Sequence, residues 1–456
     1  MQQEWLHTTE IQLGGEVAYF ISETIEVNRL SALAFFAAGE RFKGQRFFWQ
    51  NRAQTLSLVG LGHAHTIVNE AHNARFDAVE NEWKQLTQHL PKQEVQPILF
   101  GGFAFDPKQH NSKQWAELPH SIFALATFQL VMKNDTSFVT IHYIARDKNY
   151  EQAFNELRKQ REELIHAAQV KEVRTYEKPT VVEVTEPGKE KYLQSIADVT
   201  NLISQNAAKK VVIARSLALK FEEAPTSTQV LSHVKHQQPE SYLFGFEHKD
   251  ALFFGASPER LVKVEDGQAY SSCVAGSIRR GQTAEEDEQL GAELLDDDKN
   301  RGEHHYVVEM IVDIFEQTCS EVKVPNGPKL LKIRDIQHLF TPVEGKLQEG
   351  ATILQLVKSL HPTPALGGVP REAAMDIIRK CETMDRGLYA APIGWLDADG
   401  NGEFAVAIRS ALLRSDEAYL YAGGGIVEHS QPQSEYEETL VKFRPMLRAL
   451  GGQVHE

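Results

Sequence analysis

Short apolar runs of strand length recur through the second half of the sequence, and they predict a chain built on a large β-sheet. We expect strands at residues 211–219, 242–246, 252–254, 261–264, 394–397, 403–413 and 418–427. Runs of this length between turn residues are typical of strands. The segment 399–402, Asp-Gly-Asn-Gly, favours a hairpin and hence antiparallel neighbours. The predicted fold class is α+β, with a large, mostly antiparallel sheet core and helices packed outside, not a doubly wound parallel sheet.

Helical periodicity separates these strands. We expect a helix that opens at Pro187, and further helices at about residues 284–318, 350–360, 371–381 and 434–449. A charged helix over residues 150–169 is followed by a polar, β-branched stretch. This change predicts two parts: residues 1–185, an N-terminal α/β portion that completes the sheet core, and residues 186–456, which carry nearly all the unusual polar placements.

The charge balance argues against some classes of partner. Lys and Arg number 48 against 63 Asp and Glu, a formal net charge of −15. A generic nucleic-acid or membrane-surface binder is therefore not expected, although local arginines and a metal can still hold a small anion. Cys273, Cys319 and Cys381 are far apart, so neither a disulfide framework nor a zinc cluster is predicted. We see neither a signal peptide nor a membrane span, and we expect a cytoplasmic protein.

Charged residues inside apolar patterns are the first candidates for function, because a buried charge is costly unless it is paired or binds a ligand. Lys210 begins an apolar strand and shares a face with Val212 and Ala214. It is either a strand-end lysine that reaches water or a desolvated lysine that acts as a base. Glu259 lies in a bend between two apolar strands. It is either an ordinary turn carboxylate or an acid with a raised pKa.

Two helices offer further carboxylates. Glu303 shares an apolar helical stripe with Val307, where a hard cation would be a suitable partner. Alternatively, it is a first-turn acid favoured by the helix N-terminus. In the last helix, Glu435, Glu438 and Lys442 share a polar face. That face is either solvated, with one salt bridge, or supplies half of a metal site together with Glu303.

An arginine and a glycine run offer places for anions. Arg409 lies in an apolar strand beside small residues such as Ala407. Its planar fork suits a carboxylate ligand, and the alternative is a buried ion pair. The glycines at 423–425 either let backbone N–H groups approach an anion or form a tight turn. The adjacent His304 and His305 lack the helical spacing of a zinc pair and are predicted to be structural.

Taken in order, these segments resemble the chorismate-utilising enzymes, which include isochorismate synthases, salicylate synthases and the synthase subunits that make anthranilate or aminodeoxychorismate. The matching segments are residues 210–215, 255–259, 275–277, 299–304, 338–342, 361–368, 389–395, 407–409, 423–426 and 435–438. Residues 46–49 and 101–106 carry a looser match in the first part. The resemblance implies an anthranilate/aminodeoxychorismate synthase-like fold, with residues 186–456 as the chorismate-binding catalytic region.

The resemblance also implies roles for individual residues. Glu303 and Glu438, with Glu435 beside them, match residues that bind Mg²⁺, which would hold the carboxylate on the chorismate ring. Arg409 and Tyr389 match residues that hold the enolpyruvyl carboxylate. Other positions matched to the substrate-binding lining are Gly276, Ser277, His338, Ala365, Gly423 and Lys442.

The residue at position 210 indicates the branch of the family. Members that add water carry lysine here, whereas members that add ammonia carry glutamine. Because water must lose a proton and ammonia need not, we predict that Lys210 activates water for attack at C2. Glu259 would protonate the departing C4 hydroxyl. The predicted function is an Mg²⁺-dependent isochorismate synthase that feeds menaquinone or siderophore biosynthesis, with the chain length closer to the menaquinone type.

Two alternatives stay open. Salicylate synthases carry the same lysine, but they typically have threonine where this chain has Ser277. A non-catalytic chorismate-binding member is the other alternative, although loss of Lys210, Glu259 or a metal glutamate would be expected there. The expected partner is the small molecule chorismate, with no nucleic acid and no membrane. No amidotransferase subunit is expected, because its ammonia would call for glutamine in place of Lys210.

Overall fold

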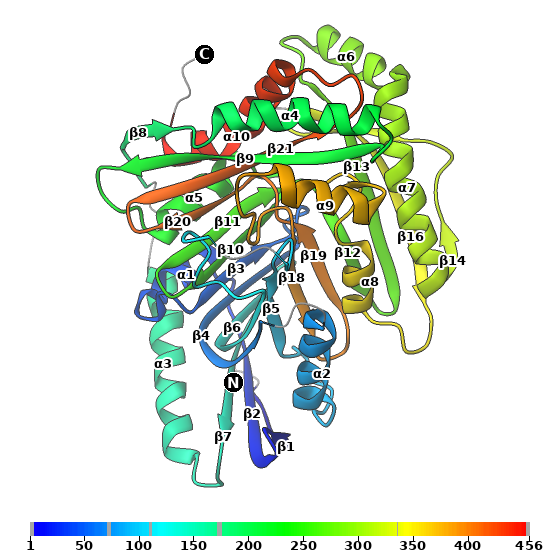
Figure 1. Ribbon diagram of the computed structural model, residues 1–456. Helices are drawn as coiled ribbons and strands as arrows, with labels where there is room; N and C mark the ends of the chain where they lie inside the picture. The colour runs from blue at the N-terminus through cyan, green and yellow to red at the C-terminus, as the bar shows by residue number, and fades with distance from the viewer. Residues whose placement is uncertain (1–3, 71–73, 109–111, 171–175, 335, 453–456) are drawn as a thin grey trace.

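The computed structural model describes residues 4–70, 74–108, 112–170, 176–334 and 336–452. Within them the strands form one 21-stranded sheet. Every strand pairing in these ranges is antiparallel. Helices lie outside the sheet (Figure 1). The predicted α+β class with a large antiparallel core is therefore confirmed.

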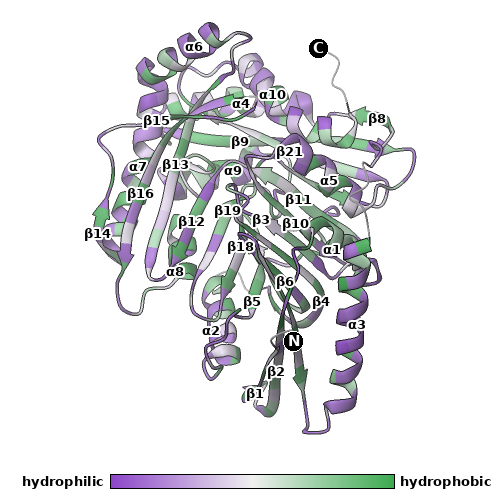
Figure 2. Cartoon of the chain, turned by 180° about the vertical axis from the view of Figure 1, so that it is seen from behind, coloured by the Kyte–Doolittle hydropathy of each residue, from purple (hydrophilic) through white to green (hydrophobic). Residues whose placement is uncertain are grey.

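The described chain up to residue 170 supplies seven strands and three helices. The strands are β1 (Glu4–Leu13), β2 (Glu16–Val27), β3 (Arg46–Gln50), β4 (Leu56–Asn69), β5 (Ile98–Phe103), β6 (Ser121–Lys133) and β7 (Thr136–Ala145). The helices are α1 (Ala32–Ala38), α2 (Arg75–Thr87) and α3 (Glu151–Val170), with a short 3₁₀ turn at Glu40–Phe42. The charged helix predicted at 150–169 corresponds to α3, whose hydrophilic residues are visible in Figure 2.

The described chain from residue 176 onward supplies the remaining strands and helices, of which the strand Val181–Thr185 still falls within the predicted first part. Its strands are β8 (Val181–Thr185), β9 (Lys210–Phe221), β10 (Tyr242–His248), β11 (Ala251–Ser257), β12 (Arg260–Glu265), β13 (Gln268–Arg279), β14 (Cys319–Lys323), β15 (Lys329–Lys332), β16 (Ile336–Leu347), β17 (Gly368–Val369), β18 (Pro392–Asp397), β19 (Gly402–Val406), β20 (Ser410–Arg414) and β21 (Glu417–Ile426). Its helices are α4 (Lys189–Ser204), α5 (Ser227–Gln237), α6 (Ala284–Asp296), α7 (Asp298–Thr318), α8 (Ile353–Leu360), α9 (Arg371–Cys381) and α10 (Pro432–Leu450).

The sheet runs without interruption from one part into the other. β3 pairs with β10, so that Trp49 lies opposite Phe244, and β5 pairs with β18, so that Phe100 lies opposite Trp395. These aromatic residues are buried in one core that draws on both parts. Phe47 stacks on Phe100 with ring centroids 4.7 Å apart. Burial of such large apolar surfaces is the main force that holds the layers together.

Helices cover the sheet where the polar residues gather. α4 packs on β9 and α10 on β21, while α7 packs on β13 and β16 (Figure 1). No helix in the described ranges is long and apolar enough to cross a membrane. The three cysteines are free thiols.

Three local predictions were wrong, each because a backbone feature interrupts a continuous pattern. The helix predicted at 284–318 breaks at Asp297, whose side chain caps α7 by accepting the Asn300 N–H at 2.6 Å. The strand predicted at 403–413 breaks between β19 and β20, where Arg409 has a φ of +49°. Pro187 lies before its helix, because Gly188, with a φ of +71°, is the N-cap of α4.

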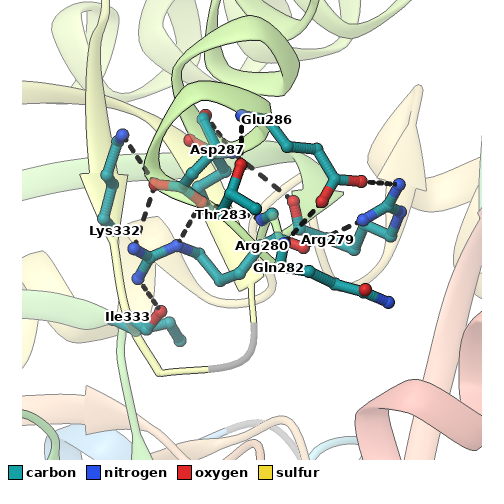
Figure 3. Close-up of polar contacts among 10 residues, drawn as sticks. Arg279, Arg280, Gln282, Thr283, Glu286, Asp287, Lys332 and Ile333 are labelled. Carbon is teal, nitrogen blue, oxygen red and sulfur yellow. Dashed lines mark hydrogen bonds and ion pairs between the residues drawn. The ribbon is translucent and has the colours of Figure 1, made fainter.

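A cluster of ion pairs fastens the start of α6 to two strands (Figure 3). Asp287 accepts hydrogen bonds from Arg280 Nε at 2.6 Å, Lys332 Nζ at 2.8 Å and the Gly281 N–H at 3.0 Å. Arg280 also donates to the Ile333 carbonyl at 2.7 Å. The bonds from Arg280 and Lys332 hold the pKa of Asp287 well below its usual range. The cluster thereby ties α6 to the end of β13 and to β15.

Asp287→Asn is expected to lower the melting temperature by several degrees at neutral pH, because the two cations lose their carboxylate. A depressed pKa stabilises the fold above the pKa of the unfolded chain, about 3.9, and that stability is lost as pH falls through the folded value. The difference from wild type should therefore shrink in acid. Thermal unfolding at several pH values measures this difference in melting temperature. Asp296→Asn, at an exposed aspartate, is the control. Equal melting temperatures at neutral pH would show that the cluster does not stabilise the fold.

Candidate active site

A cavity of about 210 Å³ lies where the sheet, α7 and α10 meet. All but one of the candidate residues line it: Glu259, Gly276, Ser277, Glu303, His338, Ala365, Tyr389, Arg409, Gly423, Glu435, Glu438 and Lys442. The exception is Lys210, whose ammonium contacts the carboxylate of Glu303. The fold thus gathers at one place residues that are spread over more than half of the chain.

Lys210 is the first residue of β9 and is only 3% exposed. Its ammonium forms an ion pair with Oε1 of Glu303. The alternative of a strand-end lysine that reaches water is therefore wrong. β17 covers the end of the strand, with Val369 opposite Lys210. Gly425 on β21 gives the side chain room, since a Cβ there would lie 2.5 Å from Lys210 Cε.

Glu259 lies between β11 and β12 and is 4% exposed. Its backbone is fixed by Val406, whose N–H donates to the Glu259 carbonyl at 3.1 Å. Burial raises the pKa of Glu259 to about 8, although Arg409 and Lys210 act in the opposite direction. An ordinary turn carboxylate is thereby excluded. The group is protonated at neutral pH and can donate a proton into the cavity.

The carboxylates on α7 and α10 reach the cavity from two sides. Glu303 lies in the second turn of α7, whose first-turn acid is Asp298, so the first-turn alternative is wrong. Glu435 is buried and accepts a hydrogen bond from Ser430 Oγ at 2.7 Å. Glu438 is half-exposed and pairs with Lys442 at 2.6 Å. The α10 face therefore does contain the expected salt bridge, but burial of Glu435 means that it is not simply a solvated face.

The electrostatics of the two α10 glutamates differ. Burial raises the pKa of Glu435, and the nearby Glu438 raises it further. Lys442 holds the pKa of Glu438 below its usual range. Lys299, which also lines the cavity, lowers both values. A cation between these acids would therefore relieve their repulsion.

The donor chemistry of Glu303, Glu435 and Glu438 suits Mg²⁺, which prefers carboxylate oxygens and retains several waters. Among the residues that the structure describes, however, no three acidic, histidine or cysteine side chains form a preassembled metal site. Glu303 and Glu438 instead pair with Lys210 and Lys442. The three residues fit a magnesium ion in kind, and each ion pair engages only the Oε1 atom of its glutamate.

Arg409 and Tyr389 also line the cavity. The left-handed backbone at Arg409, which costs roughly 1–3 kcal/mol outside glycine, places this 9% exposed residue in the cavity lining. The Tyr389 ring stacks on Tyr421 with centroids 5.3 Å apart. Burial raises the pKa of Tyr389 to about 12, so its hydroxyl keeps its proton as a hydrogen-bond donor. A guanidinium and a phenol in the lining of one cavity suit a carboxylate ligand.

Ser277 and His338 are cross-strand neighbours on β13 and β16. Ser277 Oγ and His338 Nδ1 are 2.7 Å apart. Burial lowers the pKa of His338 to about 3, so the ring is neutral. Within the described residues its Nε2 has no hydrogen-bond partner. A β-bulge precedes Ser277, and Gly276 provides its φ of +81°.

Residues 423–425 belong to β21 and pair with β9, so the tight-turn alternative is wrong.

Three lining residues were not singled out from the sequence. Lys299 and Asn300 appear there only within the matching segment 299–304, and both line the cavity. Arg386 is fully buried and holds Glu382 through two hydrogen bonds of 2.7 Å. Glu382 is only four residues away in the sequence, whereas the Leu366 and Val212 carbonyls that also accept hydrogen bonds from Arg386 come close to it only in the fold.

Comparisons with known proteins identify the family of this chain. A family model described as chorismate binding enzyme matches residues 9–451. Isochorismate synthase MenF of Bacillus subtilis (strain 168) is 40% identical over 464 residues, covering 99% of this chain and 98% of that protein. The salicylate biosynthesis isochorismate synthase of Pseudomonas aeruginosa is 35% identical, covering 95% of this chain and 91% of that protein.

Solved structures share the fold. MenF, the menaquinone-specific isochorismate synthase from Escherichia coli, superposes with a TM-score of 0.80 at 24% identity, covering 97% of this chain and 96% of that one. Anthranilate synthase component I from Streptococcus pneumoniae gives 0.71 at 23% identity, covering 86% and 92%. With a matching family model over nearly its whole length, this chain belongs to the chorismate-binding enzyme family.

Proposed function

We propose that this protein is an isochorismate synthase, which adds water to C2 of chorismate and releases the C4 hydroxyl as water. The observation that carries the proposal is the pair formed by a buried lysine at position 210 and a carboxyl group at Glu259 that is protonated at neutral pH. Glu259 can donate a proton, and Lys210 would accept one in its neutral form, which requires that its ammonium first release a proton. The isochorismate synthases among the relatives support this choice.

In the proposed reaction Lys210, in its neutral form, takes a proton from the attacking water. Glu259 gives its proton to the C4 oxygen, and the C4–O bond breaks as the new C2–O bond forms. One water enters and one leaves, so the reaction is an isomerisation overall. Each proton transfer of this kind contributes about 10²–10⁴-fold to rate.

We propose that two groups of lining residues position the substrate. Arg409 and Tyr389 would hold the enolpyruvyl carboxylate through charge-assisted hydrogen bonds. Glu303, Glu435 and Glu438 would hold Mg²⁺, which neutralises the ring carboxylate when bound. The remaining lining residues would shape the cavity and exclude bulk water: Gly276, Ser277, His338, Ala365, Gly423 and Lys442. The acidic net charge of the chain need not oppose a dianionic substrate locally, because Arg409, Lys442 and a bound Mg²⁺ would supply positive charge beside its carboxylates.

Glu303→Gln is expected to shift the magnesium titration of activity to about 10-fold or more higher Mg²⁺, because one charged ligand becomes neutral. Glu309→Gln, on the exposed side of the same helix, is the matched control and should leave the titration unchanged. The measurement is initial rate against Mg²⁺ concentration. If the Glu303→Gln and wild-type titration curves overlay, Glu303 is not a ligand of the metal.

Gly425→Ala is expected to lower kcat by about 100-fold, because a misplacement of roughly 1 Å at the reacting groups has that effect. The new methyl would meet Lys210 Cε at 2.5 Å and displace it. Gly302→Ala on α7 serves as the control, since a Cβ there has open space. If Gly425→Ala and Gly302→Ala turn over equally fast, the position of Lys210 does not limit the reaction.

A chromatographic time course with chorismate, in Mg²⁺ or in EDTA, tests the proposed function. The expected result is isochorismate that reaches a constant ratio to chorismate, and only with Mg²⁺. Salicylate with pyruvate would place the protein among the salicylate synthases instead. Absence of turnover, also with added ammonium, would favour a non-catalytic chorismate-binding protein.

The pathway is also a proposal. The relative from Escherichia coli is menaquinone-specific, which supports a role in menaquinone biosynthesis over siderophore biosynthesis. A cytoplasmic location and function without nucleic acid or an amidotransferase subunit stay predictions.

A further inference from the structure

Arg215 is a buried cation on the side of β9 that faces away from the cavity. It is 4% exposed and lies five residues beyond Lys210, so the alternation of a strand places it on the opposite face. Its guanidinium is surrounded by three aromatic rings. The ring centroids of Tyr436, Phe443 and Tyr192 lie 4.4, 5.0 and 5.7 Å away. Two of these rings belong to α10, and the third belongs to α4.

Directional hydrogen bonds attach the same guanidinium to α10. Arg215 Nε donates to Thr439 Oγ1 at 2.8 Å, and Nη1 donates to Glu186 Oε2 at 2.8 Å. The Tyr436 hydroxyl donates to the same Glu186 oxygen at 2.8 Å. Arg215 therefore holds α10 directly through Thr439 and indirectly through Tyr436. These two residues immediately follow Glu438 and Glu435 in the sequence.

There is little room for α10 to shift toward β21 at the cavity. A Cβ at Gly424 would lie only 3.0 Å from Glu435 Oε2, so this carboxylate passes close over the β21 backbone. Rotation or sliding of α10 would move Glu435 and Glu438 together, because both lie on its first turns. Fixing the helix therefore fixes the two acids relative to Glu303 on α7.

A hydrophobic residue could fill the place of Arg215 without the cost of burying a charge. What arginine adds is a rigid fork with defined directions. We propose that Arg215 is a positioning residue that sets the register of α10 and so places Glu435 and Glu438 for magnesium. The inference rests on the proposed function and on its metal site. It assigns a purpose to a residue that does not reach the cavity.

Direct metal binding tests the inference, with Mn²⁺ as a paramagnetic probe in place of Mg²⁺. Arg215→Met is expected to weaken Mn²⁺ binding by about 10–100-fold, the usual effect of losing a group that orients metal ligands. Arg215→Lys keeps the charge but not the fork, and Thr439→Val keeps the shape but not the hydroxyl. Both variants should also bind Mn²⁺ more weakly than wild type, but by a smaller factor than Arg215→Met. Excess Mg²⁺ should restore much of kcat in these two variants.

Arg161→Met is the matched control, because Arg161 is 3% exposed, pairs with the buried Glu23 and belongs to α3, which lies apart from α10 (Figure 1). It should lose thermal stability and keep wild-type Mn²⁺ affinity. Equal Mn²⁺ affinity in Arg215→Met and Arg161→Met would overturn the inference. If Arg215→Met does not fold, wild-type affinity in both Arg215→Lys and Thr439→Val would overturn it.

The wild-type protein separates this inference from the proposed function. Isochorismate formation by a wild-type protein that binds no Mn²⁺ would overturn the metal site and the inference with it, and leave the reaction standing. Failure to make isochorismate would overturn the proposed function itself.

Discussion

Lys210→Ala is expected to lower the rate of isochorismate formation by about 10²–10⁴-fold, the contribution of one general base. The methyl group of alanine cannot accept a proton from water. The fold should persist, because the partner left behind, Glu303, lines a cavity that solvent can enter. Steady-state kinetics with chorismate gives the rate, and circular dichroism checks the fold.

Lys209→Ala is a closely matched control, since Lys209 precedes Lys210 but is exposed. It should leave the rate unchanged. Unchanged turnover in Lys210→Ala would eliminate Lys210 as the base. Lys210→Gln assayed with ammonium adds a second readout, because formation of an aminated product would show that this position selects the nucleophile.

Glu259→Gln is expected to lower the rate of isochorismate formation by a similar factor, about 10²–10⁴-fold, because the amide cannot donate the proton that the C4 oxygen needs. In the wild type, activity should fall as pH rises through about 8, where Glu259 loses its proton. The measurement is kcat/KM against pH. Glu265→Gln, at an exposed carboxylate on β12, is the control. A wild-type profile that stays flat through this range would contradict the acid role.

The same substitution should stabilise the fold at alkaline pH. The pKa of Glu259 is about 8 in the folded protein, whereas a glutamate in an unfolded chain has a pKa of about 4.3. Between these values the folded state binds the extra proton, so wild-type stability falls as pH rises across the interval. Glu259→Gln removes this dependence. Thermal unfolding at the two ends of the interval should show a smaller decline in the variant.

Much of the site could be predicted from the sequence, because Lys210, Glu259 and Glu303 are charged residues in apolar surroundings. To decide whether each of these residues is structural or functional, its burial must be known. Burial depends on elements that are distant in the sequence. Val369 and Gly425, for example, enclose Lys210 only after β17 and β21 have paired with β9. The family resemblance supplied roles that residue patterns alone left open.

Other features were hidden for physical reasons. The apolar pattern continues through Arg409, so a backbone with positive φ leaves no sign in residue type. Asp297 is one of three consecutive aspartates, and only the fold shows which of them caps α7. Ser277 and His338 meet because of a strand register across 61 residues. Such long-range pairing depends on the whole sheet.

The central claim is that an external water becomes the C2 hydroxyl of the product. Turnover of chorismate in H₂¹⁸O, with mass analysis of the isochorismate formed early in the reaction, tests it most directly. We expect one ¹⁸O atom per isochorismate, located on the ring, and Lys210→Ala should form this labelled product only at its residual rate. Unlabelled isochorismate from the wild-type protein would contradict water addition, because the hydroxyl would then have migrated from C4 within the substrate.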